Sequence, residues 1–243
     1  MDGKKGTVLV GLIVVLVLLV PVCGQLAKRS MPVSSELRVE LPPGQKLVAL
    51  TFDDGPHPEY TRALLDGLKE REIRATFFLV GSQLAYAPEL VERMDREGHQ
   101  IGVHTLDHVK VEGLSQEEFL HQVEGMRREI YRLVGERELW LRPPYGQMDE
   151  RTPVWSDGPV ILWSVDPEDW RDGDADRVAR HIVSHTRDGD IVLAHDIYPS
   201  TVEGVLRAAD GLRERGFVFV TVEQLLELRG IAPKSGQVYR CAP

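Results

Sequence analysis

Two carboxylates and two histidines are the first residues of this chain whose types and spacing could do chemistry. Asp53 and Asp54 are adjacent, and on an extended segment their side chains diverge, so the two need not do the same job. His104 and His108 are four residues apart and share a face if the chain turns helically there. Two neutral imidazoles and one carboxylate form a facial ligand set for Zn²⁺ or a similar divalent ion, with positions left open for water and substrate. The pattern predicts a metal site, although Asp-Asp-Gly-Pro is also typical of a simple turn.

A second histidine pair has the same spacing and offers a comparison. His181 and His185 lie within a segment that has helical periodicity from residue 174 to residue 186. No carboxylate motif at a strand end is paired with them, so we interpret them as part of an ordinary helix surface.

Three further groups of polar residues could contribute to a reaction. Arg142 precedes two prolines, which fix the backbone and aim Tyr145 and its amide rigidly, although a rigid loop with a structural salt bridge explains the same residues. Asp166 and Asp169 place carboxylates after another apolar run. His195 ends a further apolar run, where a structural histidine is the ordinary alternative.

The elements that must position these side chains alternate between strand and helix. Short apolar runs predict strands at 47–52, 75–80, 100–103, 139–142, 160–165, 191–195 and 217–221. Amphipathic periodicity and capping residues predict helices at 60–72, 88–97, 115–133, 174–186, 202–215 and 222–228. Such alternation implies a parallel sheet, either open or closed into a barrel. Catalytic and ligand-binding residues in these folds lie at the carboxyl ends of the strands. The polar residues above are found at the ends of five predicted strands.

Composition and charge exclude several classes of protein. The chain has 243 residues with 42% apolar and 28% charged residues, which suits one large domain with a real core. Its formal charge of −9 argues against a protein that binds duplex nucleic acid, because such a protein needs clustered cations. Cys23 and Cys241 are the only cysteines, which excludes a disulfide scaffold and a cysteine-based zinc finger.

The N-terminal residues have the pattern of a targeting segment. Lys4 and Lys5 precede an apolar run from Val8 to Val20, so residues 1–24 are predicted to be a secretory signal peptide. An uncleaved membrane anchor through residues 8–22 is the second interpretation, and a lipid anchor at Cys23 is the third. All three place the rest of the chain outside the cytoplasmic membrane. Residues 25–45 are predicted to be a linker, 46–228 the catalytic domain and 229–243 a C-terminal tail.

Taken together, the motifs resemble those of the polysaccharide deacetylase family, the chitooligosaccharide-deacetylase homology domain of carbohydrate esterase family four. Five family motifs occur in order within residues 46–228: Thr51–Pro56, His104–His108, Arg142–Tyr145, Asp166–Trp170 and Leu193–His195. Each motif is modest alone, but the ordered set is specific. The resemblance implies a distorted (β/α) barrel with about seven parallel strands.

The resemblance also implies a division of labour at the metal. Asp54, His104 and His108 would hold the divalent ion, which is usually Zn²⁺ in this family, with Co²⁺ or Mn²⁺ as alternatives. Asp53 would be the general base that takes a proton from the attacking water. Arg142 would contact Asp53 and keep it ionised and oriented.

The remaining roles concern the oxyanion, the leaving group and the acetyl pocket. The family pattern implies that the backbone amide of Tyr145 stabilises the oxyanion. It implies that His195 is the general acid and that Asp166 orients it and holds it protonated. Trp170 and Leu193 would line the pocket for the acetyl methyl group.

These implications predict an enzyme that removes N-acetyl groups from N-acetylglucosamine-type residues of an extracytoplasmic glycan, with peptidoglycan as the first candidate. A metal-dependent hydrolase of another C–N bond, such as a cyclic amide or formamide, is one alternative, and an inactive glycan-binding module is another. One departure from the family pattern is visible: residues 147–159 have no helical stripe, so a barrel helix is expected to be short or lost. Trp155 in that segment is interpreted as a packing residue, with sugar stacking as the alternative.

Overall fold

The computed structural model of the protein describes residues 44–243. The predicted signal or anchor and nearly all of the predicted linker therefore lie outside the described residues. Within the described part, none of the helices is both long and apolar enough to cross a membrane.

One long strand organises the sheet. The strands are β1 (Lys46–Asp53), β2 (Thr76–Leu79), β3 (Gln100–Val103), β4 (Val160–Ile161), β5 (Asp190–His195), β6 (Phe217–Phe219) and β7 (Val238–Tyr239). β1 pairs in parallel with β2, β5 and β6, and β3 continues the sheet beyond β2. Because β1 is long, β6 pairs with its first half and β2 with its second half. The predicted parallel α/β class is confirmed.

Single parallel bridges extend these pairings around a ring. Val103 of β3 bridges to Leu141, and Leu141 bridges to Val160 of β4. Val165, a few residues further on, bridges to Val192 of β5, which already pairs with β1. The parallel pairing therefore returns to its starting strand.

The predicted strands at 139–142 and 160–165 are wrong in extent. The first is reduced to the bridge at Leu141, and the second to β4 and the bridge at Val165. The side chain of Arg142 explains the loss of regular strand pairing. Its guanidinium group donates hydrogen bonds to the carbonyl oxygens of Ile161 and Leu162, so among the described residues these oxygens are not paired with a backbone N–H of a neighbouring strand.

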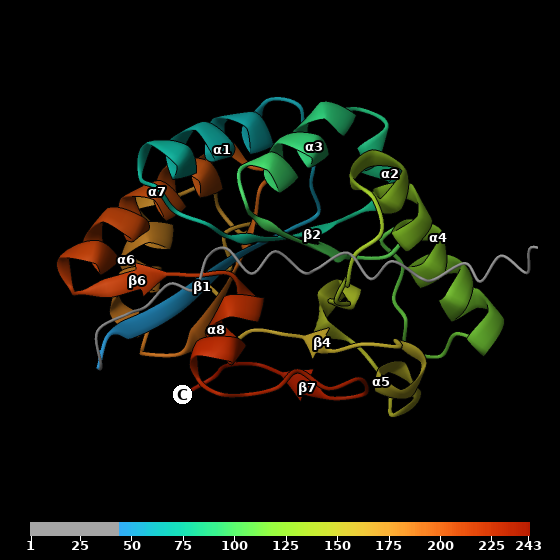
Figure 1. Cartoon of the computed structure of the whole chain (residues 1–243). Helices are drawn as coiled ribbons and strands as arrows, with labels where there is room; N and C mark the ends of the chain where they lie inside the picture. Colours follow the sequence, from blue (N-terminus) through green and yellow to red (C-terminus); the bar gives the residue numbers. More distant parts are fainter. Residues whose placement is uncertain (1–43) are drawn as a thin grey trace, which may run out of the picture. The chain divides into compact units, whose positions relative to one another are not determined.

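Five long helices of residues 44–243 cover the outer face of the strands (Figure 1). These are α1 (Tyr60–Glu70), α3 (Pro88–Arg96), α4 (Gln116–Val134), α6 (Ala175–His185) and α7 (Pro199–Glu214). The shorter α8 (Val222–Leu228) packs instead against the cluster on the inner face. α4 begins at the predicted capping box, in which Ser115 and Glu118 bond reciprocally. α7 begins a turn earlier than predicted, because Pro199 occupies its first turn, where a missing N–H has no cost.

Short helical turns complete the chain. These are α2 (Gly81–Leu84), the 3₁₀ turn η1 (Pro144–Gly146) and α5 (Arg151–Trp155). The expectation of a short or lost helix in residues 147–159 is confirmed in its first form, since α5 is present but has only five residues. The Trp155 ring packs 5.7 Å from the Phe119 ring of α4, as expected for a packing residue.

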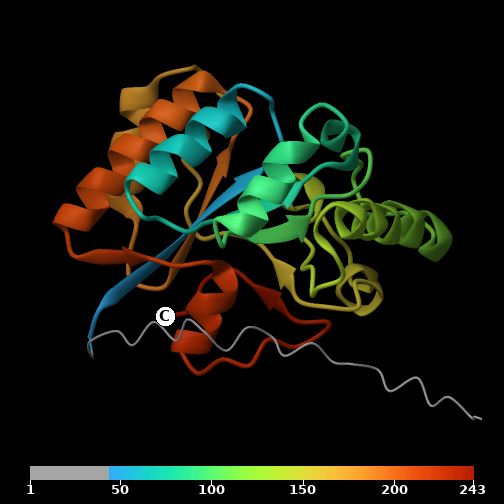
Figure 2. The same cartoon turned by 45° about the horizontal axis from the view of Figure 1, so that its top comes forward.

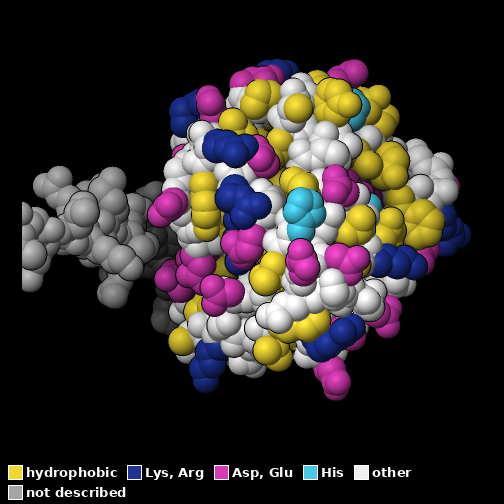
Figure 3. Space-filling view, turned by 90° about the vertical axis from the view of Figure 1, so that its right-hand side faces the viewer, with side chains coloured by type: hydrophobic (Ala, Val, Ile, Leu, Met, Phe, Trp, Pro, Cys, Tyr) yellow, Lys and Arg dark blue, Asp and Glu magenta, His cyan; other side chains and the backbone are white. Residues whose placement is uncertain are grey.

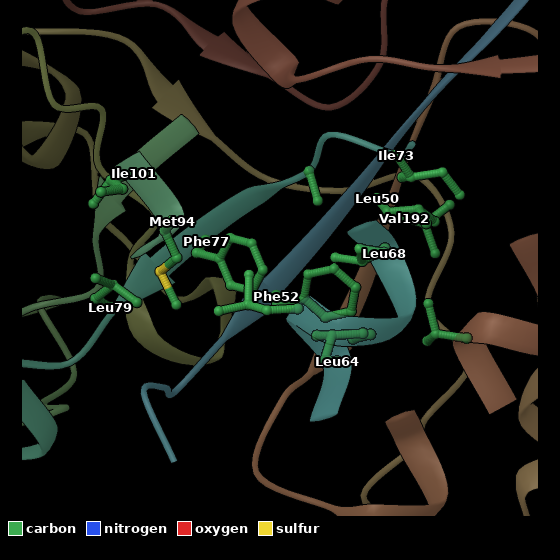
Figure 4. Packing of buried hydrophobic residues seen from close by; sticks show 14 of the residues in the cluster. Leu50, Phe52, Leu64, Leu68, Ile73, Phe77, Leu79, Met94, Ile101 and Val192 are labelled. Carbon is green, nitrogen blue, oxygen red and sulfur yellow. The ribbon is translucent and has the colours of Figure 1, made fainter. Parts of the chain in front are cut away.

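Alternate residues of β1 enter two different cores. Leu50 and Phe52 face the helices, where Phe52 stacks on Phe77 with ring centroids 5.2 Å apart and Leu64 of α1 covers them (Figure 4). Leu47 and Ala49 face the inside of the ring and join a second cluster that α8 and β7 complete. This alternation is the period of two that a strand buried on both faces requires.

The segment predicted to be a C-terminal tail is part of the compact unit that extends to Pro243. β7 pairs in parallel with β4, and Tyr239 is buried in the inner cluster. The Ala242 N–H donates to the Gly189 carbonyl at 2.8 Å. Gly189 has φ +84°, and a Cβ atom there would lie 2.1 Å from the Ala242 carbonyl oxygen, so this contact requires glycine.

Candidate metal and active site

The candidate residues meet at the carboxyl ends of the parallel strands. Asp53 ends β1 and His195 ends β5, and these two residues are register partners. Figure 2 shows the blue arrow of β1 beside the orange arrow of β5. His104 directly follows β3, and Arg142 directly follows the bridge at Leu141. Strand pairing therefore brings residues far apart in the sequence to one edge.

Three potential metal-ligand atoms converge there. Asp54 Oδ1 lies 3.1 Å from His108 Nε2 and 3.5 Å from His104 Nε2. The ligand atoms of these three residues lie within 4.8 Å of one another, and no other group of three or more such residues was found in residues 44–243. The predicted juxtaposition of Asp54, His104 and His108 is thus present in the structure.

The protonation of His104 fits a cation. Its Nδ1 atom lies 2.7 Å from the Arg142 carbonyl oxygen, which can only accept, so Nδ1 carries the proton and Nε2 presents a lone pair to Asp54. Burial lowers the pKa of His104, which favours this neutral form. Asp54 Oδ1 is buried and accepts no hydrogen bond of good geometry from any residue that the structure describes. A divalent ion binds to electron-pair donors of this kind, an imidazole nitrogen and a carboxylate oxygen that lacks a hydrogen bond.

The charge of Asp54 also fits this role. Burial raises the pKa of Asp54, but the contact with His108 and the charges of the neighbouring histidines outweigh it, so the pKa lies below its ordinary value of 3.8. Asp54 is therefore ionised at neutral pH. The Tyr145 hydroxyl lies 3.3 Å from His108 Nδ1 and helps to orient the second imidazole.

Backbone strain gathers at the same edge. Asp54, Thr105, His108 and Tyr145 have φ of 75°, 66°, 53° and 62°, although none is glycine. Such conformations cost roughly 1–3 kcal/mol each and persist where the surrounding structure enforces them. The fold thus stabilises an unfavourable local geometry in order to present these groups.

The predicted contact between Arg142 and Asp53 is confirmed. Arg142 is fully buried, and its Nη1 atom donates to Asp53 Oδ1 at 2.8 Å and to Thr51 Oγ1 at 2.6 Å. Its planar group also stacks 4.1 Å from the centroid of the Phe78 ring. Burial lowers the pKa of Arg142 from its ordinary value, and the adjacent Asp53 opposes that shift. The pair holds one oxygen of Asp53 and leaves the other 3.6 Å from His104 Nε2.

The predicted partner of His195 is wrong. Asp166 does not hold His195, because its Oδ1 atom accepts the Glu168 N–H of its own loop. The partner is Asp169, whose Oδ1 atom lies 2.8 Å from His195 Nδ1. Asp169 is buried and also accepts the His195 N–H and the Thr201 hydroxyl. The loop turns back between the two aspartates, so the second one reaches β5.

This partner changes the acidity of His195. Burial lowers the pKa of the imidazole, but the hydrogen bond and charge of Asp169, together with Asp53 and Asp54, raise it to about 9. His195 is therefore cationic at neutral pH.

The two predicted pocket residues lie close to this pair in the chain. Leu193 is buried on β5 and faces the same side as His195, two residues away. Trp170 follows Asp169 and is 57% exposed. That they line an acetyl pocket remains a prediction.

Sequence reasoning missed a supporting residue on α4. The Gln122 side-chain oxygen accepts the N–H groups of Leu106 and Asp107 at 3.1 and 3.0 Å, which fixes the loop between the two histidines. A signal was present, because Gln122 is a polar residue on the apolar stripe of that helix. His181 and His185, in contrast, stack on each other at 4.0 Å on α6, as expected for a helix surface.

A groove of about 650 Å³ lies between α4 and the segment that follows His108. Figure 3 shows the face of the molecule on this side, where acidic, hydrophobic and histidine side chains are mixed. Leu114, Leu120 and His121 are among its lining residues. None of the candidate catalytic residues lines it.

Comparison with known proteins shows similarity to deacetylases and esterases that act on carbohydrates. The family model described as polysaccharide deacetylase matches residues 40–156. The chain is 38% identical to the peptidoglycan-N-acetylmuramic acid deacetylase PdaC of Bacillus subtilis over 77% of its own length, but this match spans only 40% of PdaC. It is 34% identical to a peptidoglycan-N-acetylglucosamine deacetylase of Bacillus cereus, over 78% of this chain and 92% of that one. The structure of a family 4 acetyl xylan esterase from Clostridium thermocellum, in complex with a cobalt ion, is similar with a TM-score of 0.77 and 29% identity, over 82% of this chain and 100% of the other.

Proposed function

The chain belongs to the polysaccharide deacetylase family, and from this premise we propose that it hydrolyses the N-acetyl groups of amino sugars in peptidoglycan. The reaction adds water across the amide bond and releases acetate and a free amine. One observation carries the proposal: the ligand set of Asp54, His104 and His108 lies at the strand edge that also presents the buried carboxylate of Asp53 and the cationic His195. The relatives named above supply the substrate class.

Asp54, His104 and His108 would hold the divalent ion, with Zn²⁺, Co²⁺ or Mn²⁺ as candidates. Such an ion, when bound, acts as a Lewis acid and lowers the pKa of water. The fit rests on the unsatisfied oxygen of Asp54 and on the lone pair that His104 directs toward it.

Asp53 is the general base in this proposal. It takes a proton from the attacking water as the oxygen atom bonds to the carbonyl carbon. Arg142 holds one oxygen of Asp53 by a hydrogen bond, so the other oxygen is free to accept the proton. The backbone N–H of Tyr145, on the strained turn η1, is proposed to stabilise the negative oxygen that develops.

His195 is the general acid. When the C–N bond breaks, the nitrogen must accept a proton, or it would leave as a strongly basic anion. The contact with Asp169 orients the imidazole and raises its pKa to about 9, so it holds that proton at neutral pH. Asp53 as the base and His195 as the acid together account for both proton transfers.

Two finer features belong to the same proposal. The ring of parallel pairings supports the distorted barrel of about seven strands that the resemblance implies. The substrate and the targeting pattern of residues 1–24 support action outside the cytoplasmic membrane.

The test is acetate release by the full chain. The chain is stripped of metal with a chelator and reloaded with Zn²⁺, Co²⁺ or Mn²⁺ before addition of peptidoglycan, chitooligosaccharide or poly-N-acetylglucosamine. We expect acetate from peptidoglycan only after reloading, and on the order of 10²–10⁴ times slower release from the Asp53→Asn variant. No acetate from any of the three glycans with any of the three metals would refute the proposal. Acetate release from chitooligosaccharide alone would support the proposed deacetylation reaction but refute peptidoglycan as its substrate.

A further inference from the structure

A buried carboxyl group that has no role in the proposed mechanism directly follows His195. Asp196 has no exposed surface, and its Oδ2 atom accepts a short hydrogen bond from the Thr61 hydroxyl. Among residues 44–243, its Oδ1 atom has no hydrogen-bond partner. Burial raises the pKa of Asp196 to about 7. Burying a carboxyl group with an unpaired oxygen destabilises the folded state, so its presence here requires an explanation.

The carboxyl group of Asp196 lies against the backbone beside a metal ligand. A Cβ atom on Gly55 would lie 2.4 Å from Asp196 Oδ2 and 2.5 Å from Oδ1, so only glycine allows this approach. Gly55 directly follows Asp54, whose own φ is +75°. The carboxyl group of Asp196 thus packs directly against the backbone of the strained turn at Asp54 and Gly55.

Thr61 connects the same carboxyl group to the far end of the turn. Its hydroxyl donates to Asp196 and accepts the His57 N–H at 2.7 Å. On the other side, the Gly55 carbonyl accepts the Val80 N–H at 3.0 Å. The backbone on the C-terminal side of Asp54 is therefore held at Gly55, at His57 and at the first turn of α1.

We propose that Asp196 is a positioning residue for the metal ligand Asp54. It acts through the packing against Gly55 and the relay through Thr61, and it touches neither the ion nor the substrate. This inference rests on the proposed metal site and extends it to a residue outside the ligand set. Removing the support should let Asp54 relax toward an ordinary backbone conformation and move its oxygen away from the two imidazoles.

The test measures Zn²⁺ affinity of the full chain by competition with a chelating dye, together with the melting temperature of the metal-free protein. Removing residues that orient ligands costs on the order of 10–100-fold in metal affinity. We expect Asp196→Ala and Thr61→Val each to weaken Zn²⁺ binding at least tenfold. Asp196→Asn keeps the shape and an acceptor for Thr61, so we expect it to bind within about threefold of wild type. Thr61→Val remains informative if Asp196→Ala does not fold, because it conserves volume.

A matched control separates positioning from general stability. Thr186 is also buried, and its hydroxyl donates to the Ile182 carbonyl of its own helix, so Thr186→Val should lower the melting temperature and leave the affinity unchanged. Wild-type affinity in Thr61→Val or Asp196→Ala would overturn the inference. The titration needs no substrate, so a chain that shows the expected affinities but releases no acetate would refute only the proposed reaction. A chain that binds none of Zn²⁺, Co²⁺ and Mn²⁺ would refute both.

Discussion

Replacing Asp169 by Asn should shift the alkaline limb of the pH profile, while the same replacement at Asp166 should not. Asn can still accept the His195 backbone N–H, so the loop should keep its path. The replacement removes the negative charge beside the imidazole and the strongest support for its protonated form.

The size of the effect follows from the acidity of His195. Its pKa is about 9 with Asp169 in place, although burial alone would lower it from 6.5. Without the carboxylate we expect a pKa at or below 6.5, a difference of about 3 kcal/mol in the stability of the cation. At pH 7.5 the protonated fraction would fall from about 97% to about 9%, which is roughly a tenfold loss of rate. At pH 6 most of this loss should disappear, because His195 is largely protonated in both proteins.

The assay is kcat/KM for acetate release between pH 5.5 and pH 10, since this ratio reports the free enzyme. We expect an alkaline limb near pH 9 for the wild type and for Asp166→Asn, and near or below pH 6.5 for Asp169→Asn. A loss of orientation alone would lower the whole profile without moving the limb. A limb that moves in Asp166→Asn, or stays in Asp169→Asn, would refute the assignment of the partner.

The remaining predictions concern Arg142, His104, Asp53 and His195. Arg142→Met should destabilise the protein by about 3–5 kcal/mol in urea unfolding, because it leaves Asp53 buried without its cation; a loss below about 1 kcal/mol would contradict the importance of the pair. His104→Ala should fold but lose most bound metal in a metal analysis, whereas His181→Ala should keep it; full metal content in His104→Ala would refute the ligand set. Asp53→Asn should lose on the order of 10²–10⁴ in rate on both an acetamide and an acetylated nitrophenol, since both need an activated water. His195→Ala should be affected much less on the ester, whose leaving group departs as a stable anion; equal losses on both substrates would contradict the acid and base roles.

The sequence by itself determined the elements with strong local signals. The capping box at Ser115 and the apolar stripe after it determine where α4 begins, because these interactions lie within a few residues. The alternating runs also predicted the parallel class and the edge at which the polar residues meet. The Asp54, His104 and His108 set was predicted because its members belong to compact motifs that directly follow strong strands.

Only the tertiary structure decided which groups touch across the ring. Asp166 and Asp169 are three residues apart in one motif, and no local rule distinguishes them; the path of the loop toward β5 makes Asp169 the partner of His195. The C-terminal segment joins the inner core because β4 offers an unpaired edge, and that edge exists only after the ring has formed. The contact between Asp196 and Gly55 joins residues 141 positions apart, and it depends on the register of β1 and β5. Short-range propensity determines helices and strands, whereas contacts between distant segments depend on register and loop path, which one-dimensional patterns do not contain.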